Sequence, residues 1–176
     1  IPGAKTIEIP LTDGGEDFCE ILVEAIGGRL EETEVRGPLG EPCLAHLGFV
    51  PASGLSVAVR EEAGLPTEGE IAIVEMASVA GLQALSPEER DPWRTSTHGV
   101  GDLLLRAATR KGTSAILLGI GGSATNDLGL GALETLGLRF LDATGQPIDN
   151  RNTRCISHVI GIRLKCQPPN RKMFAT

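Results

Sequence analysis

Apolar and polar residues follow two different periods along this chain. Alternation and short apolar runs predict five β-strands, at residues 6–10, 30–35, 44–49, 55–59 and 70–76. The last four of these segments follow one another without a predicted helix between them. That succession favours an antiparallel or mixed sheet over a strict repeat of strand, helix and strand.

Apolar residues at helical spacing predict two amphipathic helices. The first ends at Gly27-Gly28, a typical helix terminus, and its apolar positions are Phe18, Ile21, Leu22 and Ala25. The second begins at Thr97 and ends near Gly112, and its apolar positions are Val100, Leu103, Leu104, Ala107 and Ala108. The apolar run at 115–120 predicts a strand buried on both faces, followed by a small helix at 128–136. This mixture of elements predicts an α/β fold.

Composition restricts the class of protein. The 176 residues are 41% hydrophobic and 22% charged, as in an ordinary soluble domain. No apolar run approaches the roughly 18 residues that a membrane-spanning helix needs. The net charge of −7 argues against a nucleic-acid partner and against an anionic membrane surface. Four cysteines without metal-ligand spacing favour reduced thiols and a cytoplasmic chain.

Charge is distributed unevenly along the chain. All 23 acidic residues lie at or before Asp149, whereas six of the 16 basic residues lie within 151–176. These last residues could form a basic binding arm, but a poorly ordered end is the interpretation we favour.

The segment 118–127 (LGIGGSATND) carries the strongest signal for a ligand site. A buried strand runs into glycines, then into small polar residues, then into a carboxylate. Free backbone N–H groups and missing Cβ atoms at such a junction suit a phosphate or carboxylate. Ser123, Thr125 and Asn126 could add hydrogen bonds, and Asp127 could hold Mg²⁺ or accept a proton.

Other interpretations of this loop stay open. Gly119, Gly121 and Ala124 match the dinucleotide fingerprint, but no acidic residue is well placed about 20 residues later. A dinucleotide-binding oxidoreductase module using Gly119-x-Gly121 is therefore one alternative. A Walker A loop would need a lysine that the segment lacks. A tight turn in which Ser123 and Asp127 merely cap a helix is another alternative.

Two further segments are candidates for chemistry. Residues 13–17 (DGGED) lie between a predicted strand and a helix, where carboxylates either cap the helix or face a ligand. Residues 75–78 (EMAS) and 90–98 (RDPWRTSTH) place small hydroxyls beside arginines that could hold a small carboxylic acid. Alternatively, Arg90 and Asp91 simply pair on the surface. The three histidines share no ligand spacing, so a zinc site is not expected.

Taken in order, these segments resemble the bacterial glycerate kinases, which phosphorylate glycerate with ATP. The resemblance covers residues 5 to 148, and its motifs are 10–16 (PLTDGGE), 37–40 (GPLG), 75–78 (EMAS), 90–92 (RDP), 95–97 (TST) and 119–127 (GIGGSATND). At two positions where members of that family carry a glycine, this chain has Asp17 and Leu128.

The resemblance implies a domain organisation. It predicts a Rossmann-like α/β domain built from both chain ends, with a second, mixed α+β domain inserted into it. Residues 1–36 would be a remnant of the discontinuous first domain, 37–150 the inserted domain, and 151–176 a poorly matching basic tail. Motifs that the family carries before and after these segments have no counterpart, so the chain resembles a fragment truncated at both ends.

The resemblance also implies a function. We expect transfer of the γ-phosphate of ATP to a hydroxyl of glycerate, with Asp13 and Asp127 as the catalytic carboxylates and Asp127 near Mg²⁺. The residues expected to bind substrate or phosphate are Gly121, Gly122, Ser123, Thr125, Asn126, Ser78 and Thr97. A fragment with an incomplete site would be weakly active or inactive, and a non-catalytic truncated relict is the second alternative. The oligomeric state is not predicted.

Overall fold

A mixed β-sheet forms the centre of the computed structural model, which describes residues 3–148, 161–164 and 173–175. Five strands lie in the order β1-β2-β3-β4-β7. The first three, β1 (Arg29–Arg36), β2 (Pro42–Pro51) and β3 (Glu70–Glu75), are antiparallel neighbours. The last two, β4 (Thr113–Gly119) and β7 (Met173–Ala175), continue the sheet in parallel with β3. The predicted α/β class is thereby confirmed, with a mixed sheet.

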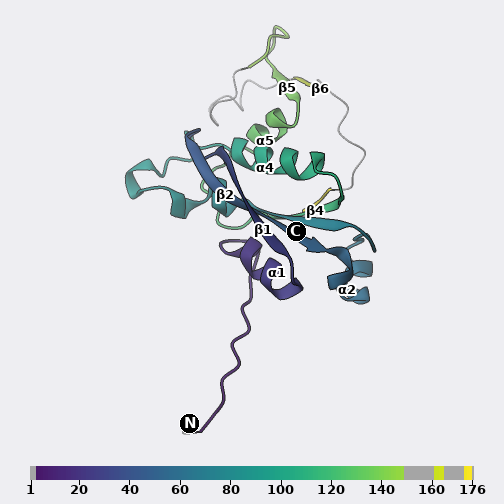
Figure 1. Ribbon diagram of the computed structural model, residues 1–176. Helices are drawn as coiled ribbons and strands as arrows, with labels where there is room; N and C mark the ends of the chain where they lie inside the picture. The colour runs from purple at the N-terminus through teal and green to yellow at the C-terminus, as the bar shows by residue number, and fades with distance from the viewer. Residues whose placement is uncertain (1–2, 149–160, 165–172, 176) are drawn as a thin grey trace.

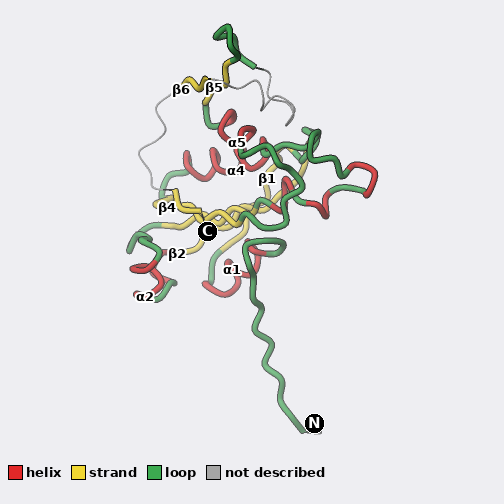
Figure 2. Tube along the Cα trace, turned by 180° about the vertical axis from the view of Figure 1, so that it is seen from behind, coloured by secondary structure: helices red, strands yellow, loops and turns green. Residues whose placement is uncertain are grey.

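Helices cover both faces of this sheet (Figures 1 and 2). Helix α1 (Phe18–Ile26) lies on one face, and α4 (His98–Thr109) with α5 (Leu130–Thr135) lies on the other. Alternation along β3 supplies both cores, because Ile71 and Ile73 join the cluster of α1 whereas Ala72 and Val74 join the cluster of α4. The chain thus builds three layers around a sheet whose strand β3 is buried on both sides.

The remaining described elements are short. They are η1 (Ala52–Gly54), α2 (Val57–Glu62), α3 (Ala77–Ala80), η2 (Leu82–Ala84), η3 (Pro87–Glu89), and the antiparallel pair β5 (Leu138–Leu141) and β6 (Gly161–Leu164). Among the described residues, no helix is both long and apolar enough to cross a bilayer.

Both amphipathic helices are confirmed. Helix α1 ends at Gly27, whose φ of 81° is the left-handed conformation that glycine adopts without strain. In α4 the five predicted apolar positions are all buried. Helices α4 and α5 approach closely at Gly101, where an added Cβ would lie 2.8 Å from Ala132 Cα. This contact holds the N-terminal ends of the two helices together.

Two predicted strands are wrong. Residues 6–10 are extended but pair with no strand among the described residues, and Ile7, Ile9 and Leu11 are exposed. Residues 55–59 lead into α2 instead, because the Ser56 side chain accepts a hydrogen bond from Val59 N–H and caps a helix there. An alternating pattern alone carries no information about a pairing partner or a cap.

The division of the chain at residue 36 stays a prediction. The strands on either side of that position, β1 and β2, pair over their whole length, from Arg29 with Phe49 to Arg36 with Pro42. The Rossmann-like character of the first domain is likewise untested. Most of the basic tail, with Cys155 and Cys166, lies outside the described residues. Cys19 and Cys43 are free thiols, and burial raises the pKa of Cys19 to about 12.

Candidate functional site

The two predicted glycine loops meet at the end of β4. Gly121 N–H donates a hydrogen bond to the carbonyl oxygen of Gly14 over 2.8 Å. A Cβ added to Gly121 would lie 2.7 Å from both the N and Cα atoms of Gly15, so only glycine permits this contact. The loop before α1 and the loop after β4, more than 100 residues apart, therefore form one backbone surface.

A second segment holds the loop after β4 from another side. Leu82 N–H donates to Gly122 O over 3.0 Å, and Ala124 N–H donates to Ala80 O over 2.7 Å. These bonds accompany an antiparallel bridge between Gly81 and Ser123. The GGSA backbone is thus fixed by α1's loop and by the segment after α3.

Most of the predicted hydroxyl residues bond within the chain. Ser123 Oγ donates to Thr125 O and accepts from Thr125 N–H, which closes a tight local turn. Thr125 Oγ1 donates to Thr95 O over 3.0 Å, and Ser78 Oγ donates to Glu75 O over 2.9 Å. These side chains shape the loops that carry them.

Asp127 lies inside the protein, 2% exposed. Its Oδ2 accepts hydrogen bonds from Thr97 N–H, the Thr97 hydroxyl and Gly131 N–H, at 2.8, 2.8 and 3.2 Å. Its Oδ1 accepts from Gly129 N–H over 2.9 Å. Thr97 Oγ1 in turn accepts from Ala132 N–H, so the pair joins the N-terminal ends of α4 and α5. This placement differs from the expectation that Asp127 faces a ligand, because four donors of the chain already use its carboxylate.

Asp13, Glu16, Asp17 and Asn126 are the exposed polar side chains of the two loops. Asp13 Oδ1 accepts from Gly15 N–H over 3.1 Å, which leaves its other oxygen to solvent. The carboxylate of Glu16 lies over Gly122, where an added Cβ would be 2.8 Å from Glu16 Oε1. Sequence reasoning quoted Glu16 within a motif but gave it no role, because only the fold brings it to the second loop.

The positions of the carboxylates bear on the expected Mg²⁺ site, which stays a prediction. Mg²⁺ keeps several waters and is usually held by one or two carboxylates together with substrate phosphates. Exposed Asp13 and Glu16 fit that requirement, whereas the saturated carboxylate of Asp127 does not. The described residues contain no cluster of three or more His, Cys, Asp or Glu side chains that could hold a metal by themselves.

Glu75, at the end of β3, is a buried carboxylate that sequence reasoning left without a role. Its Oε2 accepts a hydrogen bond from Cys19 N–H, in the first turn of α1, over 3.0 Å. Burial raises the pKa of Glu75, a rise that the Cys19 bond opposes and the charges of Glu20, Asp17 and Glu16 reinforce. Met76 N–H, next along the chain, donates to Gly119 O. Glu75 therefore lies where α1, β3 and β4 converge.

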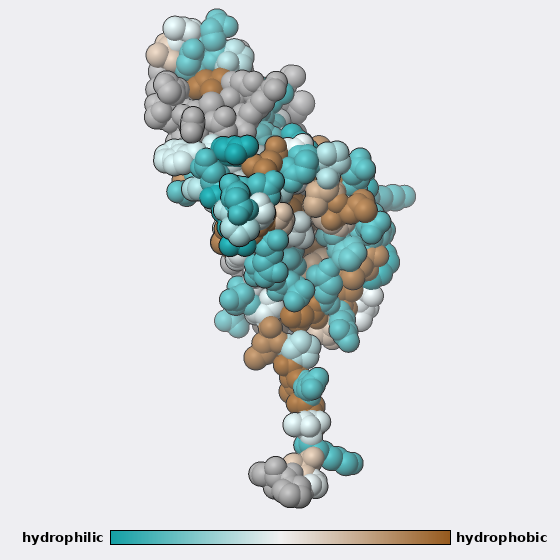
Figure 3. All heavy atoms as spheres, turned by 90° about the vertical axis from the view of Figure 1, so that its left-hand side faces the viewer, coloured by the Kyte–Doolittle hydropathy of each residue, from teal (hydrophilic) through white to brown (hydrophobic). Residues whose placement is uncertain are grey.

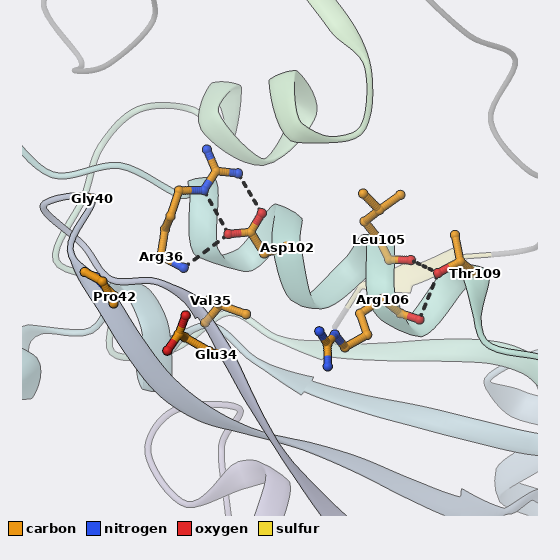
Figure 4. Close-up of a pocket in the computed structure, with 9 residues that line it drawn as sticks. All are labelled: Glu34, Val35, Arg36, Gly40, Pro42, Asp102, Leu105, Arg106 and Thr109. Atoms are coloured by element: carbon orange, nitrogen blue, oxygen red, sulfur yellow. Dashed lines mark hydrogen bonds and ion pairs between the residues drawn. The ribbon is translucent and has the colours of Figure 1, made fainter.

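A cavity of this chain lies away from the glycine loops. It measures about 550 Å³ and runs between the β1–β2 hairpin and α4 (Figure 4). Arg36 forms one wall and makes a two-pronged ion pair with Asp102, at 2.8 and 2.6 Å. Burial alone would raise the pKa of Asp102, but the hydrogen bonds and charge of Arg36 lower it overall, so this pair stays ionised.

Sheet, helices and loops together define a class of protein. Open α/β sheets hold ligands beyond the carboxyl ends of their parallel strands, which is where the glycine loop after β4 lies. The fold is therefore that of an α/β protein with a glycine loop where such sheets commonly hold ligands. The chain belongs to the glycerate kinase family, whose sequence profile matches residues 1–172.

Individual relatives agree with this assignment. The chain is 40% identical over 147 residues to the glycerate kinase of Haemophilus influenzae, and 37% identical over 147 residues to the glycerate 2-kinase of Escherichia coli. Each match covers 84% of this chain and 34% of the relative. A crystal structure assigned to glycerate kinase 2 of Salmonella typhimurium LT2 superposes with a TM-score of 0.71 at 35% identity, covering 99% of this chain and 42% of that one. The chain thus spans about a third of the length of the curated relatives it matches.

Proposed function

We propose that this chain supplies part of the active site of a kinase that transfers the γ-phosphate of ATP to a hydroxyl of glycerate, giving phosphoglycerate and ADP. The observation that supports this proposal most is the backbone contact between Gly14-Gly15 and Gly121, in a chain of the glycerate kinase family. Rigid glycine loops suit this reaction, because phosphoryl transfer depends on positioning and charge neutralisation more than on covalent catalysis.

We assign different roles to the two aspartates. Exposed Asp13 would face the attacking hydroxyl or the metal, while buried Asp127 would be a positioning residue that fixes the N-terminal ends of α4 and α5. The backbone N–H groups of Gly122 and Ser123 and the side chain of Asn126 would donate hydrogen bonds to an anionic group of the nucleotide or of glycerate. Gly121, whose N–H binds Gly14 O, would let that group approach the backbone closely. Ser78, Thr97 and Thr125 would support them from within the chain.

Mg²⁺, when bound, would neutralise charge on the transferred phosphoryl group. Asp13 and Glu16 are the residues of this chain that would hold it, beside the phosphates. The carboxylate of Glu16 would otherwise repel a phosphate at Gly122, so the arrangement is consistent with a bridging cation. We further propose a cytoplasmic enzyme, consistent with the free thiols of Cys19 and Cys43.

Glycerate-dependent ADP release with Mg²⁺-ATP tests the reaction. The chain of 176 residues should be compared with a longer protein that carries the rest of the family's length, because we expect the chain alone to be weakly active or inactive. In the longer protein, Asp13→Asn should lower kcat by about 100- to 10,000-fold, the range of a general base. Asp142→Asn, which alters an exposed turn, is the matched control. Unchanged turnover of Asp13→Asn would reject the role of Asp13, and no ADP from the longer protein would reject the reaction.

A further inference from the structure

The side chains of Ser96, His98 and Glu134 form a hydrogen-bonded series. Ser96 Oγ lies 2.8 Å from His98 Nδ1, and His98 Nε2 lies 3.2 Å from Glu134 Oε2. Because a carboxylate accepts hydrogen bonds, Glu134 favours the tautomer with the proton on Nε2. The lone pair of Nδ1 then faces the Ser96 hydroxyl. A serine, a histidine base and a carboxylate that orients the base are the groups of a serine nucleophile site.

This series opens onto a cavity of its own. A space of about 330 Å³ is lined by Arg36, Leu39, Gly40, Ser96 and His98. That volume lies within the range of small-molecule sites. His98 also lines a neighbouring cavity with Glu134 and Arg139. Ser96 itself is 4% exposed, so a substrate would reach it only through the cavity that it lines.

Arg36 adds a hydrogen-bond donor to the wall of the cavity. Its Nε and Nη2 are engaged with Asp102 and Thr135, which fixes the guanidinium plane. No hydrogen bond among the described residues uses its Nη1. A fixed donor of this kind can stabilise an oxyanion that forms beside the serine.

The series is distinct from the glycine-loop site. Thr95 Oγ1 donates to Ala124 O and Thr97 Oγ1 to Asp127, so these side chains lie toward the loop after β4. Ser96 lies between them in sequence, and its backbone N–H donates instead to Pro38 O on the hairpin. Phosphoryl transfer as proposed above uses none of Ser96, His98 and Glu134.

The geometry points to Ser96 as an acyl-accepting nucleophile for small esters with a short, uncharged acyl group. Ser96 Oγ would form a bond to the ester carbonyl carbon while its proton passes to His98 Nδ1. The carbon–oxygen bond to the alcohol then breaks, and the alkoxide takes that proton and leaves. Water then passes a proton to His98 Nδ1 and forms a bond to the acyl carbon. The bond between that carbon and Ser96 Oγ breaks, the acid leaves, and Oγ takes the proton back from His98. Leu39 supplies an apolar wall for the acyl group, and the Arg36–Asp102 pair adds no net charge.

A fluorophosphonate reagent tests this proposal on the 176-residue chain without reference to kinase activity. Ser96 Oγ should displace fluoride and carry a stable phosphonyl adduct, located by mass spectrometry of the peptide that contains Ser96. His98→Gln should slow labelling about 100-fold or more, because a general base contributes at least that factor. His98→Gln should also slow the hydrolysis of p-nitrophenyl acetate, as it slows labelling.

Ser96→Ala should abolish the adduct, whereas Ser114→Ala should leave it unchanged. Ser114 is a matched control because its partly buried hydroxyl donates to the carbonyl oxygens of Glu68 and Glu70, away from any histidine. Absence of an adduct on Ser96 in the unaltered chain overturns the proposal, even if a variant fails to fold. Equal labelling of the His98→Gln variant, folded by circular dichroism, also overturns it, because a purely structural histidine predicts that result.

Discussion

The buried carboxylate of Asp127 connects the N-terminal ends of α4 and α5 through hydrogen bonds. Its four hydrogen bonds come from three residues: Thr97 just before α4, Gly129 in the turn before α5, and Gly131 within α5. Asn at this position would place an NH₂ group against at least one of those N–H donors. Asp127→Asn should therefore lower the free energy of unfolding by about 3 kcal/mol, measured by urea titration.

The control for Asp127 is Asp142→Asn. Asp142 also accepts backbone hydrogen bonds, from Thr144 N–H and Gln146 N–H, but in an exposed turn, so its loss should cost well under half as much. Equal effects of the two substitutions would contradict the positioning role of Asp127. An Asp127→Asn variant of full stability would contradict it as well.

Leu128 carries backbone strain that the sequence alone could only suggest. Among the described residues, Asp17 and Leu128 are the two non-glycine residues with positive φ, at 62° and 55°. Both occupy positions where the resemblance to glycerate kinases has glycine. Leu128 is also 72% exposed, so its side chain contributes little packing.

Leu128→Gly should raise the free energy of unfolding by about 1 kcal/mol, because relief of left-handed strain exceeds the entropy cost of glycine. Urea unfolding measures the gain. Leu133→Gly is the comparison, since Leu133 lies inside α5, where glycine should lower stability by about 1 kcal/mol. A loss at both positions would show that Leu128 is not strained in solution.

Glu75 makes the stability of the chain depend on pH. Folding raises its pKa, mainly through burial, so the folded chain holds this proton more tightly than the unfolded chain does. The contribution of Glu75 to stability is thus greatest below its unfolded pKa, near 4.5, and is lost as pH rises through the folded value. Relative to the unaltered chain, Glu75→Gln should gain stability as pH rises above the unfolded pKa of about 4.5.

Glu70→Gln should show the opposite trend over the same urea titrations. The hydrogen bond from Arg29 lowers the pKa of Glu70, so its ionised form stabilises the folded chain above the unfolded pKa. The variant should therefore lose stability relative to the unaltered chain as pH rises. Parallel pH curves for Glu75→Gln and the unaltered chain would refute the inference for Glu75.

At the scale of elements, the contact between the two glycine loops depends on one missing methyl group. Gly121 has no positive φ, so alanine is allowed there by the backbone and excluded only by Gly15. Gly121→Ala should push the loops apart and lower the free energy of unfolding by about 2 kcal/mol. Gly15→Ala should cost less, because its Cβ would meet the movable Asp13 carboxylate at 3.2 Å. Equal costs would mean that the loops do not touch in solution.

Elements were predicted where a local pattern decides them, and missed where a distant partner does. The helices at 18–26 and 98–109 carry their own apolar stripe, so spacing suffices. Residues 55–59 also alternate, but the Ser56 cap turns them into α2. The two loops of the candidate site could be identified from the sequence, because glycine and small polar residues are concentrated in them. Burial of Asp127 and the position of Glu16 over Gly122 arise from contacts across the chain, which no local pattern encodes.

At the scale of the whole molecule, the segment before α1 stands apart from the three layers. Figure 3 shows it projecting from the body of the protein with hydrophobic side chains along it. Those side chains are Ile7, Ile9 and Leu11, which are 84%, 74% and 87% exposed. Apolar residues on an extended, unpaired backbone suit a strand that joins another sheet. The chain spans about a third of its curated relatives, so a sheet elsewhere in the longer protein is the partner we expect.

Limited digestion with thermolysin tests this view, because the protease needs an extended backbone and cuts before large apolar residues. In the 176-residue chain, the first cuts should fall before Ile7, Ile9 or Leu11. Val57 and Val59 are the internal comparison, because they are 60% and 48% exposed but lie in α2, where helical hydrogen bonds should slow cleavage. In the longer family protein, cleavage at these N-terminal sites should slow at least tenfold. If pairing in a sheet stabilises the segment by about 1.4 kcal/mol, the open form that the protease cuts becomes tenfold rarer. Protection of residues 7–11 in the short chain would instead show that the segment already pairs, with a second copy as the available partner.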